Sequence, residues 1–158
     1  MELEFFNECR YGKLYRVKEL ITQNINWHNL NDHHIFTPLM TATCNNQIEV
    51  VKFLLTQSID INQTNEWENT CLFYGCLYKH TKIVELLVKD NRIDVTRIDK
   101  FDKTVLWRNC YMGNLKIIKI LIASGRDLNY KQKTNNKLLP VVRMCFCCAL
   151  FWISQKYK

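Results

Sequence analysis

Cysteine and histidine side chains that could bind a metal ion occur in three groups along the chain. In the first, Cys71, Cys76 and His80 lie close together, at a spacing that metal ligands can have. In the second, Cys145 and Cys148 form a C-x-x-C pair, which no second ligand pair and no thioredoxin-like strand pattern accompanies. A structural zinc site normally needs four such ligands, so neither group alone predicts one.

The third group consists of histidines crowded into one segment: His28, His33 and His34. Exposure to solvent is the ordinary state of such residues, with weak metal binding as the alternative. The sequence also shows no phosphate-binding loop, no nucleophile elbow and no paired carboxylates in a recognisable setting. We therefore expect no enzyme, no cofactor and no metal site.

The elements that must position these residues repeat along the chain. Thr37 in "TPLM" returns as Thr70 in "TCLF" and again as Thr104 in "TVLW". A second apolar, helix-like burst follows in step each time, as "IEVVKFLL", "TKIVELLV" and "LKIIKILI". A strand-like tag repeats as well, as "IDIN" (59–62), "IDVT" (93–96) and "DLN" (127–129). An earlier copy of the second burst, "YGKLYRVKELI" (11–21), precedes all of these. This constant spacing, a period of about 33 residues, predicts an array of helix pairs.

With its Thr-Pro-Leu opening, the repeat resembles that of the ankyrin-repeat family over roughly residues 3 to 133, about four copies. The resemblance implies an all-α fold with short β-hairpin loops, built as an ankyrin-type solenoid of helix pairs. It places an ankyrin-repeat domain at 1–136, with repeats roughly at 1–34, 35–67, 68–101 and 102–134. Residues 137–158 remain as a divergent apolar C-terminal cap or tail.

Local chemistry agrees with this repeat. Thr37 can cap the first helix of its repeat, and Pro38 suits the first helical turn. The turn within each helix pair needs a left-handed residue, which Gly12, Asn46 and Gly113 supply more readily than Lys79. Small residues should let paired helices approach closely: Ala42 and Thr43, Gly75 and Cys76, and Cys110, although Asn109 is larger and polar there. The second helices should each bury one apolar stripe: Val51, Leu54 and Leu55; Val84, Leu87 and Val88; Ile118, Leu121 and Ile122.

The chain also departs from the family pattern. The family's His after Thr-Pro-Leu is replaced by Met40, Phe73 and Trp107, and the Gly expected in the hairpin turn by Glu68 and Asp102. Cys76 falls on a small-residue packing position and His80 on the family's turn His. We therefore interpret both as structural residues rather than as metal ligands.

In proteins of this family, partners dock on the concave side, which comprises the hairpin tips and the exposed end of each first helix. The positions that correspond at the tips are Glu66, Trp67, Lys100 and Phe101, together with His34, which His33 accompanies. The positions at the helix ends are Cys44, Asn45, Leu77, Tyr78, Tyr111 and Met112, with Arg10 and Tyr11 as N-terminal counterparts. Aromatic residues and Met are enriched at interface centres, so this set predicts a protein-binding face.

Charge and cysteine usage bear on partners and compartment. The net charge is +7, but the last 22 residues carry four bases and no acid, which leaves 18 bases against 15 acids in the body. Lysines at outward helix positions predict a solvated face, so nucleic acid is not the expected partner: Lys18, Lys52, Lys82, Lys116 and Lys119. Because no secretory signal begins the chain, Cys9, Cys71, Cys76 and Cys110 are expected as free thiols in a reducing, cytoplasmic setting.

The tail allows three interpretations. Residues 138–153 are 16 in number and 14 of them are apolar. A divergent capping helix is the interpretation we favour, although capping repeats usually carry a polar outer face. A membrane contact is the second, since the segment is too short to span but could lie on a bilayer or be acylated at its clustered cysteines. The third is a truncated or poorly packed end.

Taken together, the sequence predicts a monomeric, non-enzymatic scaffold or adaptor that binds a protein partner on its concave face. The alternative is a membrane-associated adaptor that the C-terminal tail anchors.

Overall fold

The computed structural model describes residues 2–23 and 36–126, and within these ranges the chain forms eight α-helices in four pairs. The pairs are α1 (Glu2–Tyr11) with α2 (Leu14–Thr22), α3 (Pro38–Cys44) with α4 (Ile48–Leu55), α5 (Cys71–Leu77) with α6 (Thr81–Lys89), and α7 (Val105–Tyr111) with α8 (Leu115–Ala123). The predicted all-α, helix-pair architecture is confirmed. None of these helices combines the length and apolarity that crossing a bilayer requires.

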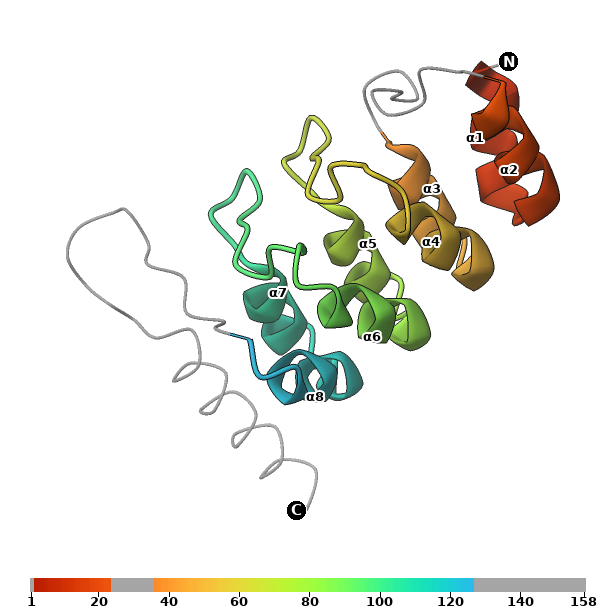
Figure 1. The fold of residues 1–158 in the computed structure, drawn as a ribbon. Helices are drawn as coiled ribbons and strands as arrows, with labels where there is room; N and C mark the ends of the chain where they lie inside the picture. Colours follow the sequence, from red (N-terminus) through yellow and green to blue (C-terminus); the bar gives the residue numbers. More distant parts are fainter. Residues whose placement is uncertain (1, 24–35, 127–158) are drawn as a thin grey trace.

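The helix pairs stack into two rows (Figure 1). The first helix of each pair contacts the first helix of the next, so α1, α3, α5 and α7 form an inner row. The second helices, α2, α4, α6 and α8, contact one another in the same order and form an outer row. The two described loops between pairs, residues 56–70 and 90–104, project from the same side of the stack (Figure 1). Each pair therefore buries its apolar face against its neighbours rather than by itself.

A threonine begins three of the four inner helices. The hydroxyl of Thr37 accepts a hydrogen bond from the backbone N–H of Met40 at 3.2 Å, as predicted. Thr70 accepts from the N–H of Phe73 at 3.3 Å and Thr104 from that of Trp107 at 3.1 Å. The repeat of threonine at this point thus reflects the need to satisfy an orphan amide at each helix start.

A left-handed residue follows each of the four inner helices. Its φ is +73° at Gly12, +58° at Asn46, +59° at Lys79 and +67° at Gly113. The amide of the next residue reaches back to close the helix, for instance from His80 N to Gly75 O at 2.9 Å. The prediction of left-handed turns is confirmed, including the unfavourable lysine at the third turn.

Lys79→Gly should therefore stabilise the protein. A side chain with a Cβ pays roughly 1–2 kcal/mol for the left-handed region, and glycine's extra freedom in the unfolded chain offsets part of that. We expect a gain of about 0.5–1 kcal/mol in the free energy of unfolding, measured by urea denaturation. Lys79→Ala is the matched control, since it removes the charge and keeps the Cβ. An equal gain in both variants would show that charge, and not backbone conformation, limits stability here.

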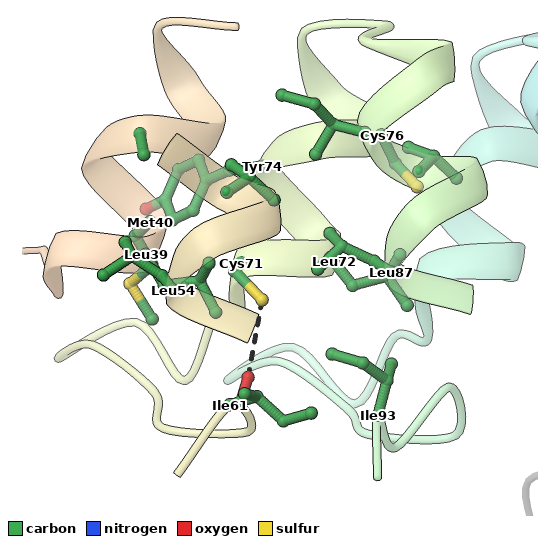
Figure 2. Close-up of a cluster of buried hydrophobic side chains, with 14 of the residues drawn as sticks. Leu39, Met40, Leu54, Ile61, Cys71, Leu72, Tyr74, Cys76, Leu87 and Ile93 are labelled. Atoms are coloured by element: carbon green, nitrogen blue, oxygen red, sulfur yellow. Dashed lines mark hydrogen bonds between the residues drawn. The ribbon is translucent and has the colours of Figure 1, made fainter. Parts of the chain in front are cut away.

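Small and apolar residues fill the space between the rows (Figure 2). A Cβ added to Gly75 would lie 3.3 Å from Val84 Cγ2 and 3.4 Å from Thr43 Cγ2, so the close approach predicted there is confirmed. Asn109, at the corresponding point of the last described pair, is also buried. It keeps its polarity satisfied by donating to Val105 O at 2.8 Å and accepting from Asn114 Nδ2 at 3.0 Å.

The apolar stripe of the outer helices differs in part from the prediction. Val51, Leu54, Val84, Leu87, Val88, Ile118 and Leu121 are buried as predicted, and Leu55 is partly buried. Ile122, however, is 51 % exposed, and Ile117 is buried instead. Val50 and Ile83 are buried at the same relative position. The stripe therefore extends one position earlier on each helix, because outer helices contact both the inner row and their own neighbours.

The strand-like tags also prove different from their prediction. Residues 59–62 and 93–96 form turns and bends, and Ile98 and Thr104 form an isolated antiparallel bridge within the described ranges. The isoleucines of the tags are instead buried against the ends of the helices: Ile61 and Ile93 are 3 % and 1 % exposed (Figure 2). Alternation of apolar and polar residues here marks which side chains are buried in a turn, not a sheet.

Hydrogen bonds from side chains to backbone carbonyls link successive helix pairs at both ends of the helices. At one end, Gln47 Nε2 donates to Arg10 O at 2.8 Å, and His80 Nε2 lies 3.0 Å from Cys44 O. At the other end, an arginine reaches back to the carbonyls that end the preceding outer helix: Arg92 to Leu55 O at 2.6 Å, and Arg126 to Asp90 O at 3.0 Å. Cations at these carbonyls complement the helix dipole.

Several predictions fall on residues outside the described ranges. These are the three histidines His28, His33 and His34, the C-x-x-C pair, the "DLN" tag, and the cap, membrane and truncation interpretations of residues 137–158.

Candidate binding surface

Two loops between helix pairs form hairpins, and a buried residue organises each. Asn65 Oδ1 accepts from the backbone N–H of Trp67 at 3.1 Å and of Asn69 at 3.0 Å. Asp99 Oδ1, at the matching point of the next repeat, accepts from Phe101 N at 2.8 Å and Lys103 N at 3.1 Å. These side chains fold the tips around themselves and present residues 66–68 and 100–102 outward.

The hydrogen bonds to Asn65 and Asp99 also hold a residue with an unfavourable, positive φ at each tip. Glu68 and Asp102 have φ values of +58° and +56°, the region that favours the glycine of the repeat pattern. The two hydrogen bonds at each tip hold the backbone there. Lys100 N also donates to Trp67 O at 3.4 Å and joins one tip to the next.

Each organising side chain is fixed to the inner helix that follows, but by different chemistry. Asn65 Nδ2 donates to the Tyr74 hydroxyl at 2.7 Å, a neutral pair. At the matching positions of the next repeat, Asp99 accepts from Arg108 Nε, a charged pair. The Asp99 side chain is 3 % exposed and that of Arg108 25 %. The second hairpin is thus held by an ion pair in a largely buried setting.

A run of contacts between aromatic rings and cations covers this region. Lys100 Nζ lies 5.9 Å from the centre of the Trp67 ring and 5.4 Å from that of Phe101. The Arg108 guanidinium lies 5.5 Å from both the Phe101 and Phe73 ring centres. These separations allow favourable cation–π contacts, which therefore link the two tips to the inner row.

The run continues along the ends of the inner helices. The ring of Tyr74 lies 5.3 Å from that of Phe73 and stacks on Tyr78 at 6.4 Å. On the next repeat, Trp107 stacks on Tyr111 at 5.4 Å, and Lys103 Nζ lies 4.6 Å from the Trp107 ring centre.

We call this region the aromatic–cation surface. It comprises Trp67, Phe73, Tyr78, Lys100, Phe101, Lys103, Trp107, Arg108 and Tyr111.

The structure places the residues predicted for binding as follows. Trp67, Lys100, Phe101, Tyr78 and Tyr111 lie within the aromatic–cation surface, with Phe101 61 % and Tyr111 79 % exposed. The others lie at the same tips and helix ends: Glu66, Asn45 and Met112 are exposed, and Cys44 and Leu77 are partly buried. His34 is outside the described residues.

The prediction omits four members of the surface: Phe73, Lys103, Trp107 and Arg108. A signal for two of them is present in the sequence. Phe73 and Trp107 stand where the family pattern has a His, and unlike Met40, which is 0 % exposed, both are only partly buried. An aromatic replacement at that position in two successive repeats could have been taken as part of the surface.

Comparison with known proteins fixes the family. A family model described as ankyrin repeats in three copies matches residues 6–65 and again residues 57–132. The chain belongs to the ankyrin-repeat family. Ankyrin repeats generally mediate contacts between proteins, and the ankyrin-repeat domain is typically non-catalytic.

Two curated relatives share the ankyrin repeats over part of the chain. The chain is 33 % identical to the ankyrin repeat protein nuc-2 of Neurospora crassa over 79 residues, which cover 50 % of this chain and 7 % of that protein. It is 31 % identical to the palmitoyltransferase AKR1 of Lachancea kluyveri over 84 residues, which cover 51 % of this chain and 11 % of that protein. The match thus spans a small fraction of either relative.

The free thiols in the described part of this ankyrin-repeat chain lie in or against the core. Among the described residues the free thiols are Cys9, Cys44, Cys71 and Cys76; Cys110 is not one of them, which departs from the prediction. Burial raises the pKa of Cys9, Cys44 and Cys71 to about 12 each. Thiols of that kind stay protonated at neutral pH and are poor nucleophiles and poor metal ligands.

The first of the possible metal groups is accounted for by structural contacts. Cys71 Sγ donates to Ile61 O at 3.4 Å (Figure 2), Cys76 is 1 % exposed in the core, and His80 reaches Cys44 O. Within residues 2–23 and 36–126 no three Cys, His, Asp or Glu side chains are arranged to hold a metal ion.

One small cleft borders the aromatic–cation surface in the described part of the chain. A cleft between the two hairpins, lined by Phe73, Arg97, Asp99 and Lys103 among others, holds only about 10 Å³. A larger hollow of about 380 Å³ lies between α6 and α8 on the outer row, lined by Val88, Ile120 and Arg126 among others. Small-molecule sites usually occupy concave pockets of roughly 300–1,000 Å³. The cleft beside the aromatic–cation surface is therefore much smaller than a usual small-molecule site.

Proposed function

We propose that this protein is a non-enzymatic ankyrin-repeat interaction module that binds a protein partner through the aromatic–cation surface on its concave side. The observation that carries the proposal is the continuous run of ring and cation contacts from Trp67 through Phe101 and Arg108 to Phe73. Trp67 and Arg108, both partly exposed in that run, are of the residue types that dominate the binding energy of protein interfaces.

Rigidity supports the same proposal. The tips are held by backbone hydrogen bonds to buried Asn65 and Asp99, and each of these side chains is fixed to an inner helix. A surface that is already ordered before binding loses less conformational entropy when a partner docks. The rings are therefore presented in a fixed arrangement.

Replacing Trp67 and Phe101 together with Ala should abolish partner capture and leave the helices folded. Truncating two central aromatic residues typically weakens an interface by roughly 2 kcal/mol or more, which is about 30-fold in the dissociation constant. The measurement is affinity capture from lysate with mass spectrometry, followed by titration of the captured protein against each variant. Circular dichroism checks that each variant remains helical.

Tyr15→Ala with Ile122→Ala is the matched control. These residues are 78 % and 51 % exposed and lie on outer helices α2 and α8. This pair removes a similar amount of exposed apolar surface from the other row, so binding should persist. Loss of the partner from the control, with capture unchanged in the Trp67/Phe101 variant, would place the binding face on the outer row and contradict the proposal.

A further inference from the structure

Two lysines on the aromatic–cation surface have aromatic rings as their neighbours. Lys100 lies over Trp67 and Phe101, and Lys103 over Trp107. In the described part of the chain no carboxylate oxygen comes within 4.0 Å of either ammonium group, whereas Arg108 of the same surface is paired with Asp99. Each ammonium thus remains available to an anionic group that arrives from outside, with an aromatic ring directly beneath it.

The surroundings argue against a long polyanion as that group. Glu66, Glu68 and Asp102 are exposed on the same tips and have no ion pair with the described residues. A nucleic-acid site concentrates bases along a track that follows the phosphates, and these carboxylates would repel such a backbone. A partner with a few isolated carboxylates, placed where the two lysines are, experiences less of that repulsion than a continuous phosphate backbone.

Polarity changes along the stack and sets where apolar groups of a partner would lie. The end of α1 presents Tyr11 and that of α3 Asn45, while the ends of α5 and α7 present Tyr78, Tyr111 and Met112. Phe101 is 61 % exposed on its tip between them. On the last two described pairs these apolar residues lie together with Lys100 and Lys103.

We propose, building on the protein-binding function above, that the partner contributes an extended segment in which acidic side chains alternate with large apolar ones. Its carboxylates pair with Lys100 and Lys103, and its apolar side chains cover Phe101, Trp107 and Tyr111. The cleft of about 10 Å³ between the hairpins leaves no room for a deeply inserted side chain, so such a segment would lie across the tips. Each carboxylate meets an ammonium that is already held above a ring, so pairing requires little ordering of the lysine.

Selection from a random peptide display library, with the full chain as bait, tests this proposal. We expect enriched peptides to combine Asp or Glu with Leu, Phe, Trp or Tyr within a few residues. Binding of a synthetic enriched peptide, measured by fluorescence anisotropy, should weaken about tenfold or more on Lys100→Ala with Lys103→Ala, and binding to the native chain should weaken as salt is raised. Replacing the peptide's acids with their amides should produce a similar loss with the native chain and little additional loss with the lysine variant.

Lys116→Ala with Lys119→Ala is the matched control, because both lysines are exposed on α8, in the outer row. Peptide affinity should be unchanged in it. Enriched peptides that need Trp67 and Phe101 but contain no acid would overturn the acidic-segment proposal and leave the protein-binding function standing. If no enriched peptide needed Trp67 and Phe101 for binding, both the acidic-segment proposal and the proposed protein-binding function would be overturned.

A single-stranded oligonucleotide of mixed sequence forms a separate arm of the experiment. Anisotropy should show no binding that depends on Trp67 and Phe101. Tight binding that those residues and the two lysines control, in place of peptide binding, would mean that the surface takes nucleic acid and would overturn the proposal.

Discussion

Replacing Leu54 with Asp should unfold the helix stack. Leu54 is 0 % exposed on α4, is among the largest fully buried side chains, and lies within the cluster of core side chains (Figure 2). Losing a buried leucine costs about 2–5 kcal/mol, and a carboxylate buried without a partner adds several more. That loss is comparable to the total free energy of unfolding of a typical domain, roughly 5–15 kcal/mol. The far-ultraviolet circular dichroism at room temperature should lose most of its helical signal.

Ile122→Asp is the control for this experiment. Ile122 also lies on an outer helix, but at 51 % exposure it keeps its substituent in contact with water. The helical signal of this variant should match that of the unchanged protein. A soluble and fully helical Leu54→Asp protein would contradict the assignment of the buried stripe.

Replacing Asp99 with Ala should destabilise the second hairpin by about 3 kcal/mol or more. The change removes the partner of Arg108 and the one oxygen, Oδ1, that accepts from the backbone amides of Phe101 and Lys103. Breaking a buried ion pair by removing one member typically costs roughly 3–5 kcal/mol, and the partial exposure of Arg108 places this case toward the lower end. Urea denaturation measures the loss.

Asp99→Asn separates the two contributions. An amide oxygen still accepts from the two backbone amides, as Asn65 does in the preceding repeat, and only the charge is lost. We expect its destabilisation to be smaller than that of the Ala variant. Adding Arg108→Tyr then transplants the neutral Asn65–Tyr74 pair and should recover part of the stability. If Asp99→Ala were neutral, the hairpin would not depend on this carboxylate.

The repeat and its capping chemistry could be predicted from the sequence because they are local. Thr37, Thr70 and Thr104 each satisfy an amide in the first turn of their own helix, and Gly12 and Asn46 each meet a backbone requirement of their own turn. Such features depend on neighbours along the chain, so a period in the sequence is enough to identify them.

Features that depend on contacts between repeats were harder to predict. Whether Ile117 or Ile122 is buried depends on how α8 is rotated about its axis against α6. The spacing of apolar residues alone does not determine this rotation. The turns at 59–62 and 93–96 alternate in polarity as a strand would, although their isoleucines plug the base of the helices.

The candidate surface was predicted in part for the same reason. The tip aromatics Trp67 and Phe101 follow from position in the repeat, since the pattern places every tip outward. The joining role of Arg108 does not, because it arises from one side chain that contacts Asp99, Phe73 and Phe101 at once. Only the folded arrangement brings these groups from two repeats together.

Hydrogen–deuterium exchange of the full chain, alone and with its captured protein partner, tests the central claim most directly. Partner binding should slow exchange at the amides of residues 66–69 and 100–103 and at the ends of α5 and α7, and leave the outer helices unchanged. Protection confined to α2, α4, α6 or α8, with the two hairpin tips exchanging as in the free protein, would contradict the proposed binding surface.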